Sequence, residues 1–160
     1  MYGQSDMGHI RTWLVGLLLI FTLAACLPET GPPPDNPYQA LMLGEINADR
    51  RAAGVPELGW SPKLGGLAAG WACILADQNA FYHRDLTAVI NDPEYANFST
   101  LGENLAFGPR GAGVSSIENS WMNSPAHRAI MLSPSFTLVG VAYCENATQV
   151  YWVANFGALR

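Results

Sequence analysis

Charged residues are scarce in this sequence, which has eight Lys and Arg and thirteen Asp and Glu among 160 residues, a net charge of −5. Arg11 is one of the eight basic residues, so only seven lie beyond residue 25, and they form no cluster. Nucleic-acid binding needs a basic patch that neutralises phosphates. We therefore expect no nucleic-acid partner.

Signatures of common enzyme classes are missing as well. The sequence has no HExxH zinc-protease motif, no GxSxG nucleophile motif and no Gly-rich phosphate loop. It also lacks internal repeats and long low-complexity tracts. After a leader is removed, about 125–135 residues remain, which is the size of one domain with a core of its own. The chain therefore predicts one globular domain without a recognisable catalytic motif.

A hydrophobic run covers Trp13 to Ala25 and follows Arg11. Thirteen residues are too few for a helix that crosses a bilayer, but they suit the core of a signal peptide. The run ends in Leu23-Ala24-Ala25-Cys26, which resembles a bacterial lipobox. We expect residues 1–25 to be a lipoprotein signal peptide and Cys26 to carry lipid (palmitate among its acyl chains). The protein would then be extracytoplasmic and anchored to a membrane, at the cell surface or in a periplasm; an ordinary signal peptide is the alternative.

Residues 26–36 are rich in proline and predict an extended tether between the membrane and the domain. The alternative is an ordered arm that lies on the domain. With Cys26 lipidated, Cys73 and Cys144 remain as an even pair in an oxidising compartment, which favours a disulfide. Two buried free thiols are the alternative.

Two helices are predicted at the start of the domain. Asn36 or Asp35 caps the first one, Pro37 lies in its first turn, and Leu41, Ile46 and Ala53 mark its buried face up to Gly54. Ser61-Pro62 begins the second helix, which ends near Asn79.

The second half of the domain predicts strands as well as helices. Residues 103–108 suit a short strand, and Ser115 with Glu118 forms a capping box that opens a short helix. Residues 136–144 and 150–156 alternate as two strands of an antiparallel hairpin. Helices precede the hairpin without strand–helix–strand alternation, so the fold class is α+β.

Four sequence blocks occur in a characteristic order: EINADRRAAG, FYHRD, GENLAFG, and SWMNSPAHRAIML followed by FTLVGVAYC and YWVANFG. Together they resemble the bacterial branch of the CAP superfamily, the SCP domains of cysteine-rich secretory, antigen 5 and pathogenesis-related type proteins. The resemblance implies that residues 37–160 form a CAP/SCP domain. It also implies a three-layer α–β–α sandwich with a small central antiparallel sheet, and a groove lined by two His and two Glu.

By position, the resemblance assigns His83, Glu103 and His127 to this groove, with Asn104 beside them. Ser124 stands where the family has its second Glu, so the tetrad is incomplete. Three ligands and a water can still hold zinc, and weak zinc binding is the cofactor expectation. Without metal, Glu103 would instead accept hydrogen bonds and tie two loops together.

Two functions remain open on these grounds. The first is an exported, lipid-anchored binding module whose groove holds a lipid, a cell-wall fragment or a protein. The second is a metal-assisted hydrolase that acts on peptide or cell-wall substrates. The missing ligand at Ser124 and the absent catalytic motifs favour the binding module.

Overall fold

The structure is a computed structural model that describes residues 29–160. The predicted signal peptide and the predicted lipidation of Cys26 lie outside this range. No helix among the described residues has the length and apolar character needed to cross a membrane.

A four-stranded sheet forms the centre of the domain. Its strands are β1 (Gly59–Trp60), β2 (Phe98–Pro109), β3 (Leu138–Glu145) and β4 (Gln149–Leu159), in the order β1-β3-β4-β2. The β2–β4 and β3–β4 pairs are antiparallel, and the β3–β4 pair is the expected hairpin. The two-residue β1 differs from the expected antiparallel sheet because it pairs with β3 in parallel.

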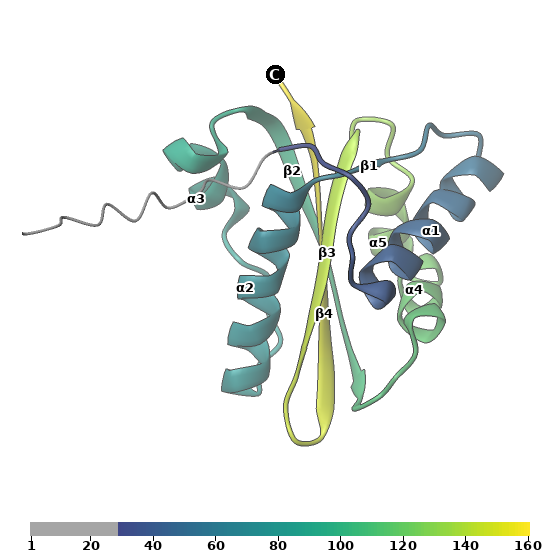
Figure 1. Ribbon diagram of the computed structural model, residues 1–160, viewed down its shortest axis with the longest axis vertical. Helices are drawn as coiled ribbons and strands as arrows, with labels where there is room; N and C mark the ends of the chain where they lie inside the picture. The colour runs from purple at the N-terminus through teal and green to yellow at the C-terminus, as the bar shows by residue number, and fades with distance from the viewer. Residues whose placement is uncertain (1–28) are drawn as a thin grey trace, which may run out of the picture.

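Helices cover both faces of this sheet, as Figure 1 shows. On one side lie α2 (Pro62–Gln78) and α3 (Leu86–Asn91), and a 3₁₀ turn at Pro93–Tyr95 leads from α3 into β2. On the other side lie α1 (Pro37–Ala52), α4 (Val114–Met122) and α5 (Pro125–Met131). The predicted α+β class and the three-layer α–β–α sandwich are therefore confirmed.

Side chains of β4 supply both halves of the hydrophobic core. Trp152 and Phe156 pack into the core beneath α1 and α4, whereas Tyr151 and Val153 pack against α2. This alternation follows from the two-residue repeat of a strand. Because both faces of β4 are buried, the strand fixes the two helical layers relative to each other.

Helix α1 has the predicted ends but a different buried face. Asn36 caps it by accepting hydrogen bonds from two backbone amides, and Gly54 follows it with a φ of 72°. Leu41 is 50% exposed, so its predicted burial is wrong. Ala53 is exposed too, whereas Ile46 is buried as predicted; Met42 and Arg50 also lie on the buried face.

Arg50 is fully buried because the surrounding chain supplies acceptors for its guanidinium group. It donates hydrogen bonds to the carbonyl oxygens of Pro56, Met131, Ser133 and Phe136, at 2.6–3.2 Å. An arginine is not expected inside from hydrophobic periodicity, which explains the error in the predicted face.

The predicted capping box of α4 is wrong. The helix begins after Gly113 and no side chain caps it. Ser115 lies within the helix and donates to Oε1 of Glu45 at 2.5 Å. Glu118 is only 6% exposed and is hydrogen-bonded to Asp49, so it belongs to the contact between α1 and α4.

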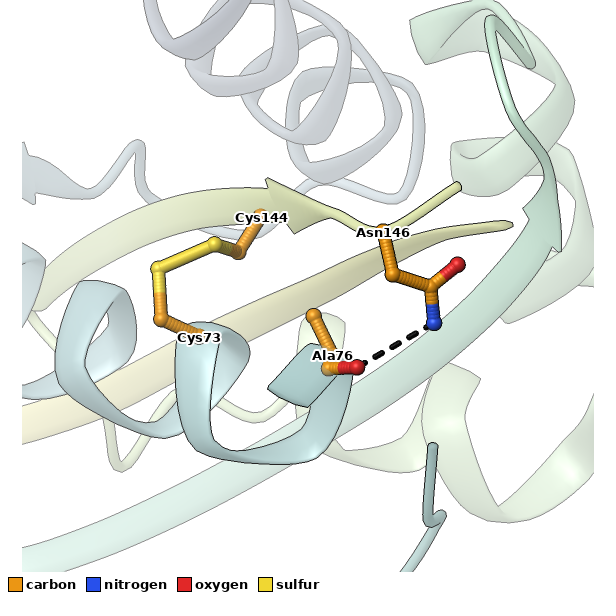
Figure 2. The surroundings of a disulfide bond; sticks show 4 residues. All are labelled: Cys73, Ala76, Cys144 and Asn146. Atoms are coloured by element: carbon orange, nitrogen blue, oxygen red, sulfur yellow. Dashed lines mark hydrogen bonds between the residues drawn. A yellow bond between two sulfur atoms is a disulfide. The ribbon is translucent and has the colours of Figure 1, made fainter. Parts of the chain in front are cut away.

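The predicted disulfide is present between Cys73 on α2 and Cys144 on β3, with a Cα–Cα distance of 4.9 Å (Figure 2). It joins the helical layer to the sheet across 71 residues of sequence. A loop of this length predicts a stabilisation of about 4 kcal/mol on the chain-entropy scale. Near the bridge, Nδ2 of Asn146 donates to the carbonyl oxygen of Ala76, the bond drawn in Figure 2.

The described part of the predicted tether, residues 29–36, lies on the domain. The amide of Gly31 donates to the carbonyl oxygen of Trp60 at 3.2 Å. Oε1 of Glu29 accepts from Nζ of Lys63 at 3.2 Å and from Nδ2 of Asn97 at 2.9 Å. For these residues the free spacer is wrong and the alternative, an ordered arm, holds. We call residues 29–36 the arm.

Candidate functional site

Glu103 lies near the middle of β2, and its carboxylate is buried. Its side chain is 1% exposed. Oε1 accepts a hydrogen bond from Nδ1 of His83 at 2.9 Å and from the backbone amide of Arg84 at 3.3 Å. Oε2 accepts from Nδ2 of Asn155 at 3.2 Å and pairs with Nε of Arg84 at 3.6 Å. Donors from two other segments of the chain therefore surround this carboxylate.

His83 is the exposed member of this pair. It follows α2, which ends at Asn79 in a left-handed conformation, and its side chain is 57% exposed. A carboxylate acceptor at Nδ1 fixes the proton on that nitrogen, so the neutral ring keeps Nε2 as a free acceptor or ligand atom. Glu103 thus holds the ring of His83 in one tautomer.

Arg84 fixes the loop that carries His83. Its guanidinium group lies over the ring of Trp71, 4.8 Å from the centroid, while Nε1 of Trp71 donates to the carbonyl oxygen of Tyr82. Burial lowers the pKa of Arg84, and the charge of Glu103 opposes that shift. Stacking and ion pairing together hold the loop against α2.

Asn104 and His127 lie at the other face of β2. Successive residues of a strand point to opposite faces, so Asn104 is directed toward α5 where Glu103 is directed toward α2. Nδ2 of Asn104 donates to the carbonyl oxygen of His127 at 3.0 Å. Burial, and secondly the charge of His83, lowers the pKa of His127, so its imidazole is neutral at pH 7. His83 therefore lies near enough to His127 for its charge to act on that imidazole.

Ser124 lies at the start of α5, three residues before His127. Its carbonyl oxygen accepts from the amide of Arg128, and its side chain makes no capping hydrogen bond. Among the predicted site residues, hydrogen bonds join His83 to Glu103 and Asn104 to the backbone of His127, and the side chain of Ser124 takes part in neither.

The zinc site implied by the resemblance does not fit these residues. Within residues 29–160, no group of three His, Cys, Asp or Glu side chains has an arrangement that could hold a metal ion. Both oxygens of Glu103 already accept hydrogen bonds, so this carboxylate orients the ring of His83 and offers no open oxygen to a metal. No chemical step through a metal follows from this arrangement.

Sequence reasoning missed two residues of the site, Arg84 and Asn155. Arg84 follows His83 directly in the FYHRD block, so its position was a signal that could have been used. Asn155 pairs with Glu103 only because of the register between β2 and β4. No local pattern in the sequence reports that register.

Exposed aromatic rings adjoin His83. Phe81, Tyr82 and Phe107 are each 46–48% exposed, and we call them the aromatic surface. The rings of Phe81 and Phe107 lie 4.8 Å apart, and Tyr82 packs edge-on against Trp71. Clustered exposed apolar side chains mark interaction sites more often than single ones do.

Comparisons with known proteins agree with this architecture. The profile of the CAP family, described as the Cysteine-rich secretory protein family, matches residues 43–156. The uncharacterized protein YkwD of Bacillus subtilis is 28% identical over 131 residues, which cover 79% of this chain. The alignment covers 49% of YkwD, so the chain spans about half the length of that relative.

Two solved structures share the fold. An outer surface protein of Borrelia burgdorferi has a TM-score of 0.67 and 20% identity, covering 75% of this chain and 91% of that one. An extracellular protein of Bacillus anthracis that contains an SCP domain has a TM-score of 0.60 and 23% identity, covering 80% of this chain and 45% of that one. At these identities the likeness concerns the fold.

Proposed function

Because this chain belongs to the CAP family, the Cysteine-rich secretory proteins, we propose that it is an extracytoplasmic binding module anchored through lipid at Cys26. Its binding site comprises His83 and the aromatic surface. Its ligand is a component of the cell envelope, and a cell-wall fragment fits best. The competing function is a metal-assisted hydrolase.

The state of Glu103 is the observation that carries this choice. A general base or a metal ligand needs a carboxylate that can reach a water, a substrate or a metal. The carboxylate of Glu103 is buried and accepts hydrogen bonds from His83, Arg84 and Asn155. It therefore acts as a positioning residue for the loop and for the ring of His83.

The exposed groups beside Glu103 determine which kind of ligand the site can bind. Nε2 of His83 can exchange hydrogen bonds, and the aromatic surface offers apolar ring faces. This combination suits a ligand with polar groups and apolar faces, such as a cell-wall fragment. An isolated acyl chain would leave the polar groups of the site without partners.

Export is supported independently. The Cys73–Cys144 disulfide is typical of an oxidising compartment. The similar proteins of Borrelia burgdorferi and Bacillus anthracis are described as an outer surface protein and an extracellular protein. Both observations agree with a lipobox at Cys26, which adds the membrane anchor to the proposal.

Co-sedimentation with purified cell walls tests this function, with release of soluble fragments measured in the same tubes. We expect the protein to sediment with the walls and to release no fragments. His83→Ala and Phe107→Ala should each weaken sedimentation. Tyr38→Ala is the matched control, because Tyr38 is 54% exposed on α1 in the opposite helical layer.

Fragment release that disappears in Glu103→Gln would support the hydrolase instead. Equal sedimentation of wild type, His83→Ala and Phe107→Ala would show that His83 and the aromatic surface do not form the binding site.

A further inference from the structure

The first residue of the arm lies at one end of the molecule. Glu29, the first residue that the structure describes, is held by Lys63 and Asn97. The hydrogen bond from Asn97, ahead of that from Lys63, lowers the pKa of Glu29, so the carboxylate is charged at pH 7. Glu29, Asn97, Leu159 and Arg160 together line a cavity of about 240 Å³.

Only Leu27 and Pro28 separate Glu29 from Cys26 in the sequence. Three residue steps span at most about 11 Å even in a fully extended chain. A lipid on Cys26 would therefore hold Glu29 within about that distance of the bilayer surface. The docked arm leaves no long spacer between the membrane and the domain.

We propose that the end of the domain formed by Glu29, Asn97, Leu159 and Arg160 lies against the membrane that holds the lipid anchor. This inference rests on the lipidation proposed above and adds the orientation of the domain. Leu159 is 41% exposed there and can enter the headgroup region, and the charged groups of Glu29 and Arg160 beside it can remain among the polar headgroups.

The direction of the strands determines which end of the domain is far from the membrane. Strand β4 runs from Gln149 at the hairpin to Leu159 at the membrane end, ten residue steps or about 33 Å. Figure 1 shows the carboxyl terminus and the first described residues at one end and the β3–β4 hairpin at the other. The hairpin turn at 146–148 is therefore directed away from the bilayer.

The same axis places the candidate site near the membrane. Glu103 pairs with Asn155, four residues before Leu159, which is about 13 Å along the strand. His83 would thus meet ligands close to the membrane, in the layer of cell wall next to it or at the headgroups. The aromatic surface extends from this level away from the bilayer, because Phe107 lies four residues beyond Glu103 on β2.

Two matched cysteine variants test the orientation. Ala96→Cys lies beside Asn97 at the membrane end, Ala147→Cys lies in the hairpin turn, and both alanines are exposed. Each full-length protein is purified with its lipid, labelled with a thiol-reactive fluorophore, and placed in phosphatidylethanolamine and phosphatidylglycerol vesicles. A fraction of the headgroups carries a quencher. The disulfide between Cys73 and Cys144 protects those sulfurs from the label.

We expect the fluorophore at position 96 to be quenched several-fold more strongly than the one at 147. A flexible Gly-Ser insertion between Pro28 and Glu29 should reduce this difference. Equal quenching at 96 and 147, or stronger quenching at 147, would overturn the orientation.

The mass of the purified protein distinguishes a failure of the proposed lipidation from a failure of the proposed orientation. A mass without diacylglycerol would reject the lipidation and the orientation together. A lipidated mass with equal quenching at both positions would reject the orientation alone.

Discussion

The carboxylate of Glu103 joins parts of the chain that are far apart in sequence. His83 and Arg84 reach it from the loop after α2, and Asn155 reaches it from β4. A buried charge is stable only when donors replace its water shell. The site is therefore as much a part of the fold's polar core as a contact point for a ligand.

Replacing Glu103 with Gln should lower the free energy of unfolding by about 1–3 kcal/mol, because the mostly buried Arg84 loses its ion pair and the new amide NH₂ group faces other hydrogen-bond donors. Urea denaturation followed by circular dichroism measures this loss. Glu57→Gln is the control, since the Arg51–Glu57 pair is exposed on both sides and should contribute less than about 1 kcal/mol. An unchanged stability of Glu103→Gln would contradict this, and would mean that the groups donating to Glu103 can be hydrated instead at little cost in free energy.

Glu118 is the second buried carboxyl group, and it makes stability depend on pH. Burial raises its pKa from 4.5 to about 8, and the hydrogen bond and charge of Asp49 and the charge of Glu45 add to this shift. The unfolded chain releases the proton near pH 4.5, while the folded protein keeps it up to about pH 8. The free energy of unfolding therefore falls as pH rises through this window.

We expect Glu118→Gln to remove this fall, because the amide stays neutral. Between about pH 5 and pH 8, wild type should lose roughly 1–3 kcal/mol relative to the variant. Urea titrations at several pH values give the two slopes. Asp77→Asn, at an exposed carboxylate on α2, should keep the wild-type slope. Parallel slopes for wild type and Glu118→Gln would contradict the raised pKa.

At the scale of elements, α2 approaches β3 closely at two glycines. A Cβ on Gly140 would overlap the backbone of Leu64 and Gly65. This close approach lets α2 pack along β3 and β4, beside the disulfide that links α2 to β3. Position 140 therefore tolerates no side chain unless the helix moves away from the sheet.

Gly140→Ala should destabilise the protein by about 1–3 kcal/mol or more, since the clash is with backbone atoms that cannot rotate away. Gly44→Ala is the matched control. Gly44 lies in α1 with nothing within 4 Å of its added Cβ, so alanine should stabilise the helix by up to about 1 kcal/mol. Thermal unfolding of the two variants beside wild type separates these outcomes by the sign of the shift. A stable Gly140→Ala protein would mean that α2 can move outward freely.

The whole molecule combines a family domain with a proposed membrane anchor. Cys26→Ala should move the protein from the membrane fraction to the soluble exported fraction, or leave an uncleaved precursor, because the thiol that carries the lipid is gone. Fractionation followed by immunoblotting measures this. Ser5→Ala, a change in the same leader outside the lipobox, should leave the protein in the membrane fraction. Unchanged membrane partition of Cys26→Ala would refute the lipoprotein proposal.

Local signals in the sequence determined the ends of the two long helices and the place of the β3–β4 hairpin, whereas β2 runs from Phe98 to Pro109 and is twice as long as the predicted strand 103–108. Asn36 and Ser61 cap the two long helices where the sequence predicted, and Asn79 ends α2. Alternation predicted the β3–β4 hairpin, and the even pair of cysteines predicted the disulfide. Such signals act over a few residues or follow from composition and compartment, so the chain itself contains them.

Tertiary structure alone decided the contacts between distant segments. The register of β2 on β4 placed Asn155 beside Glu103, and the carbonyl groups around α1 buried Arg50. Docking of Glu29 on Lys63 and Asn97 turned a predicted spacer into an arm. A charged group can be buried only where packing brings donors or acceptors from distant segments next to it, and local sequence patterns do not predict which groups these are.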